Sequence, residues 1–122
     1  MAKLLDLKTL TDKRGNLTVI EEELPFDIKR IFFIYGVDSS VRGKHRHKKT
    51  RQFLVSLKGE CRICNKSSKE APLEVFELNS PDKALLLEPE DWHFMDNFSE
   101  DCILQVFAST KFDPTDYIYE EY

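Results

Sequence analysis

The stretch RGKHRHKKTRQFLVSLKG, residues 42–59, contains two of the three histidines of the chain. His45 and His47 are one residue apart, and an apolar run over 53–57 and a Lys-Gly turn follow them. Because side chains alternate across a β-strand, two residues spaced in this way on an extended segment point to the same face. Two imidazoles that face one cavity suit metal binding or proton transfer near neutral pH. The alternative is a solvated surface strand, because Lys and Arg surround the pair.

Length and composition bound the class of protein. A chain of 122 residues, 41% hydrophobic and 33% charged, is typical of one soluble globular domain, so we expect a single domain over 1–122. A net charge of −4 disfavours a nucleic-acid-binding protein, which would need a strongly basic face. No apolar stretch approaches the roughly 20 residues of a membrane span, and charge interrupts the N-terminus before a secretory signal forms. We therefore expect a cytoplasmic protein that binds neither nucleic acid nor a membrane.

Short β-branched and aromatic runs separated by turn signals predict strands along the whole chain. In order they are 3–10, 17–22, 28–37, the histidine stretch, 53–57, 61–65, 73–78, 84–87 and 102–109. No segment has a sustained helical period, and we expect the tail, 112–119, to form one short helix or to pack across the barrel. This pattern predicts an all-β fold, a small single-domain jelly-roll barrel of antiparallel strands.

The cysteines predict neither a disulfide framework nor a zinc site. Their number is odd, and Cys61 and Cys64 are separated by an odd offset within a predicted strand. Their sulfur atoms should therefore lie on opposite faces of the sheet.

Two motifs in the middle of the chain resemble those of the cupin family. His45-x-His47, Gln52 and Gly59 match H-x-H-x4-E-x6-G, with Gln in place of Glu. The segment PEDWHFMDN, 89–97, resembles P-x-G-x2-H-x3-N, although it is one residue shorter between Pro and His and has Asp where Gly is usual. The resemblance implies a small jelly-roll barrel, in agreement with the strand pattern.

Four blocks, in order along nearly the whole chain, resemble the dTDP-4-keto-6-deoxyglucose 3,4-ketoisomerases. They are Asp12-x-Arg14-Gly15-x-Leu17, Arg30-x-Phe32-x-Ile34-Tyr35, Arg42-Gly43-x-His45-x-His47-Lys48 and Asp116-Tyr117-Ile118. The resemblance implies an isomerase of deoxysugar biosynthesis that moves a carbonyl from C4 to C3 of a dTDP-linked keto sugar before a transaminase installs an amine. It also implies a homodimer. The chemistry requires no cofactor.

The catalytic roles follow from what a ketone shift needs. A proton leaves C3, an enediol or enediolate forms, and a proton reaches C4, so groups that exchange protons near neutral pH are required. We expect His47 to be the main acid and base, with His45 positioning the substrate or carrying the oxygen-bound proton. Tyr35, Arg14 or a second imidazole would donate to the developing oxyanion.

Substrate binding is expected from Arg14, Arg42, Gln52 and His93. Arg42 precedes a glycine, where the chain can turn, and is our candidate for the pyrophosphate. Gln52 has the opposite parity to His47, so both reach the cavity only if 48–51 contains a bulge or turn. The resemblance places Arg14 and His93 at the site, and on that basis we favour the galacto-configured product.

A metal site is the alternative interpretation of the same residues. Gln52 stands where a cupin usually supplies a carboxylate ligand, and Gln is a weaker ligand, so we predict no metal. His45, His47 and His93 could still form a three-histidine zinc site with an open position. The alternatives are then a metal-dependent cupin enzyme, such as a dioxygenase or a sugar isomerase, and a non-catalytic sugar-binding cupin.

Overall fold

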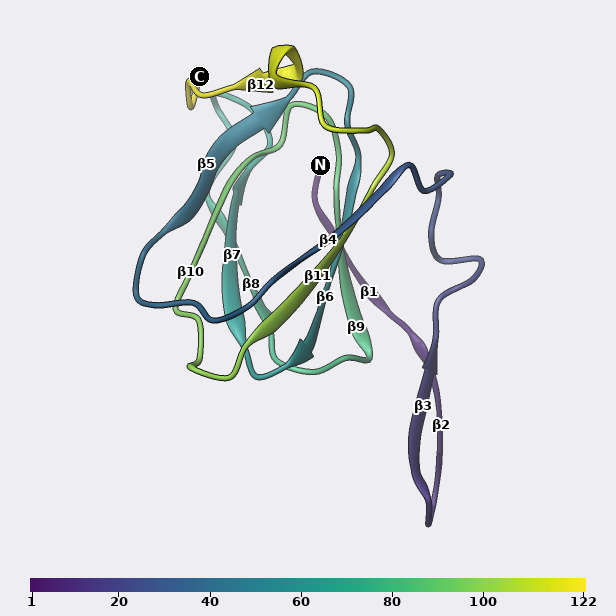
Figure 1. The fold of residues 1–122 in the computed structure, drawn as a ribbon. Helices are drawn as coiled ribbons and strands as arrows, with labels where there is room; N and C mark the ends of the chain where they lie inside the picture. Colours follow the sequence, from purple (N-terminus) through teal and green to yellow (C-terminus); the bar gives the residue numbers. More distant parts are fainter.

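Two five-stranded antiparallel sheets face each other, and a separate hairpin projects from them (Figure 1). The computed structural model describes all of residues 1–122. The first sheet has the order β1 (Lys3–Asp6), β9 (Lys83–Leu87), β6 (Gln52–Lys58), β11 (Ile103–Ala108) and β4 (Arg30–Ile34). The second has the order β12 (Tyr117–Ile118), β5 (Arg42–His47), β10 (Trp92–Asp96), β7 (Cys61–Lys66) and β8 (Glu74–Leu78). The hairpin consists of β2 (Lys8–Asp12) and β3 (Gly15–Val19), and a 3₁₀ turn, η1 (Pro114–Asp116), precedes β12. The predicted all-β jelly-roll barrel is confirmed.

The hydrophobic core fills most of the space between the sheets. Residues directly opposite each other on neighbouring strands share a face, so Phe32, Val106 and Leu54 form one inward row across β4, β11 and β6. The core cluster contains Leu54, Cys61, Ile63, Leu78, Leu85, Leu87, Met95, Cys102, Leu104 and Val106. Each fully buried aliphatic side chain of this kind stabilises the fold by about 1.5–3 kcal/mol.

The outer face of the first sheet carries a second, smaller core. It contains Leu7, Phe53, Val55, Ala84 and Leu86, and the residues packed against it include Ile20, Leu24 and Phe26. The segment after β3 therefore covers the middle of this face. At the edge strand β4 the alternate side chains of Ile31 and Phe33 stay exposed.

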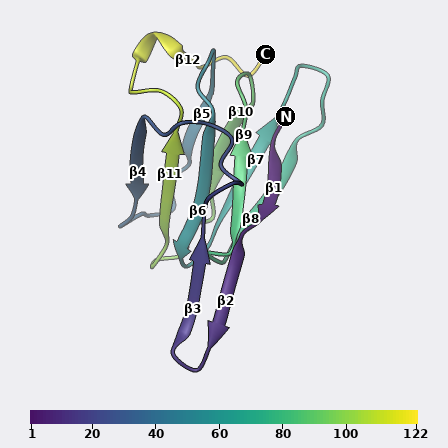
Figure 2. The same cartoon turned by 90° about the vertical axis from the view of Figure 1, so that its right-hand side faces the viewer.

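The predicted first strand, 3–10, is two strands in the structure. Leu7, between the two strands, is buried, and its backbone N–H donates to the carbonyl of Asp82, just before β9. Beyond Leu7 the chain leaves the sheet. β1 pairs with β9, whereas β2 pairs only with β3, and the resulting hairpin extends beyond the sheets (Figure 2). The alternating pattern continues through both strands and did not reveal the break.

The sequence prediction missed one strand, β10, and left two forms open for the tail. β10 follows directly after the turn signals of 89–91, and its sequence, WHFMD, has no simple alternation of apolar and polar residues because its polar His93 faces inward. The tail combines both expected forms, since η1 is a single helical turn and β12 pairs with β5.

Cys61 and Cys64 lie on opposite faces of β7. Cys61 lies in the core cluster, whereas Cys64 is outside it and opposite the exposed Val75, so the predicted separation of the two sulfur atoms is confirmed.

The chain forms no α-helix long and apolar enough to cross a membrane.

Candidate active site

A cavity of about 230 Å³ lies between the two sheets. Every face of it is built by strands, with the first sheet on one side and the second sheet on the other. Its lining residues are Arg30, Phe32, Ile34, Arg42, Gly43, His45, Gln52, His93, Met95, Val106 and Tyr117. Of the residues predicted from the sequence, the structure therefore brings together His45, His93, Gln52 and Arg42.

Three imidazoles meet at this cavity. His45 on β5 stands directly opposite His93 on β10, with ring centroids 4.9 Å apart, and His47 is 5.0 Å from His45. His47 and His93 are buried, and His45 is half-buried. His47 is not itself among the lining residues, but its ring lies 4.6 Å from that of Tyr117, which is. The prediction that His45 and His47 point to one face is confirmed.

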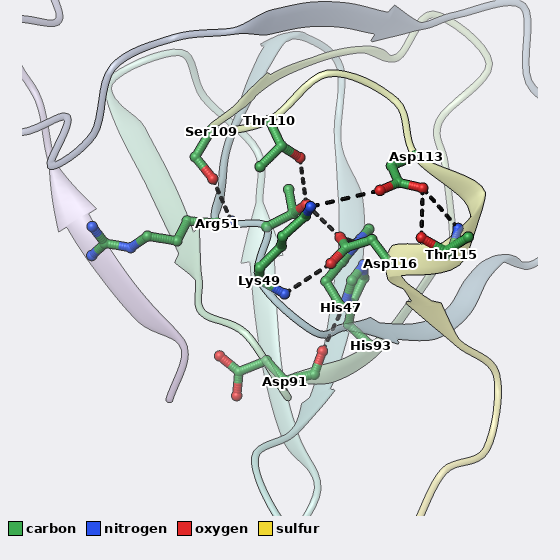
Figure 3. A network of polar contacts seen from close by, with 11 residues as sticks. His47, Lys49, Arg51, Asp91, His93, Ser109, Thr110, Asp113, Thr115 and Asp116 are labelled. Carbon is green, nitrogen blue, oxygen red and sulfur yellow. Dashed lines mark hydrogen bonds and ion pairs between the residues drawn. The ribbon is translucent and has the colours of Figure 1, made fainter.

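A buried carboxylate orients His47. Asp116 Oδ2 lies 2.9 Å from Nδ1 of His47, and the same carboxylate accepts hydrogen bonds from the hydroxyl of Thr50 and from the backbone N–H of Lys49 at 2.8 Å (Figure 3). Because an ionised carboxylate only accepts, Nδ1 of His47 carries the proton and donates it. Nε2 then has a free lone pair, and it is buried with no hydrogen-bond partner. A His-carboxylate pair with an unused Nε2 is the arrangement of a general base.

Burial keeps the three imidazoles neutral. It lowers the pKa of His45 to about 4 and that of His93 to about 3, in each case helped by repulsion from a neighbouring imidazole. Burial also lowers the pKa of His47, against the raising effect of the hydrogen bond and charge of Asp116. Burial of Asp116 opposes its ionised form, yet hydrogen bonds from Thr50, Lys49 and His47 outweigh this and lower its pKa. The pair is therefore a neutral imidazole beside a carboxylate.

His93 is fixed by the turn that precedes it. Its Nδ1 lies 3.0 Å from the carbonyl of Asp91, so Nδ1 is the donor and Nε2 is the acceptor. The side chain of Asp91 is also buried, where it accepts from the amide of Asn65 and from the backbone N–H of Glu88. The carboxylate of Asp91, at the glycine position of the resembled motif, is thus bonded within the protein.

A β-bulge aims Arg42 at the cavity. His93 pairs with His45, but the next residue, Phe94, pairs with Gly43, so Lys44 is extra. Gly43 has φ +90° and Lys44 has φ +61°, conformations in which the chain bends sharply. The extra residue reverses the alternation, and Arg42 joins His45 on the inner face.

Gln52 reaches the cavity through the break between β5 and β6. The bend at 48–51 takes the chain from one sheet to the other, as the parity argument required. In the first sheet Gln52 stands opposite Ala108, which in turn stands opposite Arg30. All three share the inner face.

Tyr35 does not line the cavity of its own chain. Tyr35 comes directly after β4 and, like Phe33 two residues earlier, points away from the cavity. It is 67% exposed, and its ring centroid lies 6.1 Å from that of Phe33. A separate shallow hollow contains it together with Arg42. Tyr35 is separated from the imidazoles because side chains alternate along β4. The resemblance block alone did not indicate to which side Tyr35 points.

Arg14 is also remote from the imidazoles of its own chain. It lies at the tip of the hairpin, where it pairs with Asp12 at 2.7 Å and its side chain is 91% exposed. A hollow of about 390 Å³ surrounds it, larger than the histidine cavity, but no histidine or cysteine lines it. We therefore place the chemistry at the smaller cavity.

Sequence reasoning missed three residues of the site, Asp116, Tyr117 and Arg30. Asp116 is 69 positions from His47 and approaches it only because β12 pairs with β5. Each of the three belongs to a block that carries the resemblance, which was the only signal available. Periodicity alone marked none of them.

The three imidazoles could also hold a divalent metal. One nitrogen from each of His45, His47 and His93 lies within 4.8 Å of the others. The Nδ1 atoms of His47 and His93 already bond to oxygen acceptors, and histidines that ligate a metal commonly use their other ring nitrogen in this way. The donor set thus fits zinc, and the geometry by itself suits both a metal and an acid-base cluster.

Comparisons with known proteins identify relatives over the whole length. The family model described as "FdtA: WxcM-like, C-terminal" matches residues 1–122. A TDP-4-oxo-6-deoxy-alpha-D-glucose-3,4-oxoisomerase from Aneurinibacillus thermoaerophilus is 40% identical over 119 residues, 95% of this chain and 84% of that protein. The crystal structure of QdtA, a sugar 3,4-ketoisomerase from Thermoanaerobacterium thermosaccharolyticum in complex with TDP, is 42% identical with a TM-score of 0.90, over 98% of this chain and 88% of that one. WlaRA, a TDP-fucose-3,4-ketoisomerase from Campylobacter jejuni, is 36% identical with a TM-score of 0.87, over 98% and 89%.

Proposed function

This chain belongs to the FdtA family and is an isomerase, and from that premise we propose that it converts dTDP-4-keto-6-deoxyglucose to a dTDP-3-keto-6-deoxyhexose by proton transfer on histidine. The observation that carries the proposal is the buried His47–Asp116 pair, in which Nε2 of His47 has a free lone pair and the ring lies 5.0 Å from that of His45 on the cavity wall. The similarity to 3,4-ketoisomerases, one of them in complex with TDP, supports the substrate class. Neither a redox cofactor nor a covalent nucleophile is needed.

The reaction begins at C3 of the sugar. The C3–H bond breaks and its proton passes to Nε2 of His47, while the electron pair forms a C3–C4 double bond and charge moves to the C4 oxygen. Asp116 stabilises the imidazolium that results, as an acceptor on Nδ1 does.

The second half of the reaction delivers the proton to C4. The C3 hydroxyl passes its proton to the C4 oxygen and becomes the new ketone, while C4 takes up a proton from the His47 imidazolium, which returns to its neutral form. His45, at the cavity wall and 4.8 Å from the ring of Tyr117, is placed to carry the proton between the two oxygens. Arg42, at the exposed rim, binds the pyrophosphate, while Gln52 and His93 contact the sugar.

A homodimer is part of the proposal. The hairpin carries Leu10 and Leu17 away from the sheets, each more than half exposed, and the edge strand β4 exposes Ile31 and Phe33. An exposed apolar edge of this kind needs cover, which a second copy supplies. We expect sedimentation equilibrium to give twice the monomer mass, and Leu10→Glu with Leu17→Glu to lower it. A monomeric parent protein would contradict this part.

The galacto-configured product depends on that dimer. His93 lies at the cavity, but Arg14 is at the hairpin tip, so Arg14 acts on the sugar only if the hairpin reaches the cavity of a second copy. The two products differ in configuration at C4, which NMR of the released sugar distinguishes. The resulting 3-keto sugar is a substrate for a transaminase. The amino-sugar pathway and the cytoplasmic location stay predictions.

The test of function is solvent exchange. The protein is incubated with dTDP-4-keto-6-deoxyglucose in deuterated water, and NMR follows both the new ketone and deuterium incorporation. Because Asn keeps hydrogen-bonding capacity but cannot take up a proton, His47→Asn should lower both rates by about 10²- to 10⁴-fold while TDP still binds. His45→Asn should lower them less. Parental C3 exchange in His47→Asn would move the base to another residue.

A metal-dependent cupin enzyme is the second candidate, and the three clustered imidazoles are the observation that favours it. Bound zinc would supply Lewis acidity at the sugar oxygens. Exhaustive chelation separates the two proposals. We expect the isomerisation rate to stay unchanged, whereas loss of activity that one divalent metal restores would favour the second candidate. Binding of the keto sugar without any exchange would indicate a non-catalytic sugar-binding protein.

A further inference from the structure

Arg30 is half-buried at the start of β4 and lies on the wall of the histidine cavity. It shares a row with Ala108 and Gln52 across three strands of the first sheet. Ala108 carries only a methyl group, so the long Arg30 side chain has room to extend between the sheets. The residue is thus built into the site from the side opposite the imidazoles.

The guanidinium is held by aromatic rings and by no carboxylate. It lies 4.5 Å from the ring centre of Phe32 and 5.3 Å from that of Phe112. Contacts to aromatic faces fix the plane of a guanidinium without using its N–H donors. No hydrogen bond or ion pair in the protein uses the Arg30 side chain, so its donors are free to bind a ligand.

This lack of a partner distinguishes Arg30 from most arginines of the chain. Arg14, Arg46, Arg51 and Arg62 each pair with an acidic side chain at 2.6–2.7 Å. The two that do not are Arg30 and Arg42, and both line the cavity. A cavity with two unpaired guanidinium groups is complementary to a ligand that carries negative charge at two separate places.

The two arginines occupy different depths. Arg42 is exposed at the rim, with Asp38 as its nearby charge, where the pyrophosphate of a nucleotide sugar extends to solvent. Arg30 is half-buried on the cavity wall formed by the first sheet, and His45 and His93 line the same cavity from the second sheet. A sugar bound against the imidazoles therefore lies between them and Arg30.

We propose that Arg30 binds the C4 oxygen of the sugar and stabilises the enediolate that forms there, whereas Arg42 binds the pyrophosphate. The inference rests on the proposed ketoisomerase function. As His47 removes the C3 proton, the C4=O bond becomes a C–O⁻ single bond, and the N–H donors of Arg30 form charge-assisted hydrogen bonds to it. The apolar side chains of Phe32, Ile34 and Val106 line the same cavity, and apolar surroundings strengthen such an interaction.

The experiment compares Arg30→Gln with Arg42→Gln as a matched control. Loss of one oxyanion donor typically costs about 10²- to 10³-fold in kcat. We expect Arg30→Gln to lower kcat and C3 deuterium exchange by that order, with the Kd for TDP, measured by calorimetry, within about threefold of the parent. Arg42→Gln should instead weaken TDP binding by about tenfold or more, with kcat much less affected. Arg30→Lys keeps the charge and should recover part of kcat, and circular dichroism checks that all variants are folded.

Two outcomes overturn the assignment. If Arg30→Gln weakens TDP binding as much as Arg42→Gln and leaves kcat intact, Arg30 is a phosphate ligand. If a folded Arg30→Gln exchanges the C3 proton at the parental rate, the oxyanion is stabilised elsewhere. The parent protein is measured in parallel, because absence of exchange in the parent would reject the ketoisomerase proposal and the assignment together, whereas parental exchange in both proteins would reject the assignment alone.

Discussion

Asp116 gives His47 a defined tautomer. Its carboxylate is itself held by the hydroxyl of Thr50 and the backbone of Lys49, so it cannot turn away from Nδ1. Thr50 in turn contacts the hydroxyl of Thr110 at 2.6 Å, which extends the network to the end of β11 (Figure 3). The position of one imidazole thus depends on residues from three separate parts of the chain.

We expect Asp116→Asn to lower the exchange rate by about 10²- to 10⁴-fold. The amide can donate to Nδ1, which would move the ring proton to Nε2 and remove the lone pair that accepts the C3 proton. Glu70→Gln, at an exposed position, is the control for loss of one negative charge. Rates from deuterium incorporation, with TDP binding measured in parallel, separate a chemical effect from a loss of substrate. Full activity of Asp116→Asn would show that His47 needs no partner.

The pH dependence of kcat/KM reports His47. Its pKa lies below the ordinary value of 6.5, and only the neutral imidazole can accept the C3 proton. We therefore expect a constant kcat/KM from pH 8 to about 6.5 and a fall at lower pH, as the imidazole becomes protonated. An acidic limb centred above pH 7 would contradict a buried neutral His47.

The bulge in β5 is the element that places Arg42. Gly43 has φ +90°, and a Cβ atom added there would lie 3.1 Å from the carbonyl oxygen of His93 and 3.2 Å from the Cα of Phe94. The backbones of β5 and β10 approach this closely because the glycine has no side chain. A side chain at this position would push apart the two strands that carry His45 and His93.

Gly43→Ala should reduce the free energy of unfolding by about 1–3 kcal/mol and raise KM, since Arg42 loses its position. Gly36→Ala is the matched control, because Gly36 also has a positive φ, +63°, but nothing lies within 4 Å of the added Cβ. Urea denaturation and steady-state kinetics measure both effects. Equal stability losses and an unchanged KM in the two variants would show that the close approach is unimportant.

At the scale of the whole molecule, the site reduces stability at acid pH. His45 and His93 stay neutral in the folded protein down to about pH 4 and pH 3. In the unfolded chain the same groups take up protons once the pH falls below about 6.5. The unfolded state therefore gains protons first, and the free energy of unfolding falls from about pH 6.5 downward.

We expect the urea midpoint to be constant from pH 8 to 7 and to decrease progressively between pH 6.5 and 4. His93→Gln removes one of these buried imidazoles and should give a shallower decrease than the parent protein shows. Comparison of slopes rather than of absolute midpoints separates this effect from any loss of packing. An unchanged slope in His93→Gln would show that His93 does not cause the acid sensitivity.

The sequence by itself determined the all-β class, most of the strands and the histidine pair. Local pattern suffices for these features because alternation and turn chemistry act between neighbouring residues. The resemblance blocks added the enzyme family, which the comparisons confirm.

Only the tertiary structure decided which residues surround the imidazoles. Asp116 contacts His47 through the pairing of β12 with β5, and Arg30 and Gln52 share the inner face because both stand opposite Ala108 of β11. Tyr35 belongs to a resemblance block, yet alternation along β4 turns it outward. Such contacts join residues far apart in the chain, so they depend on strand order, register and one bulge, and a one-residue shift in any of them would reverse which side chains face the cavity.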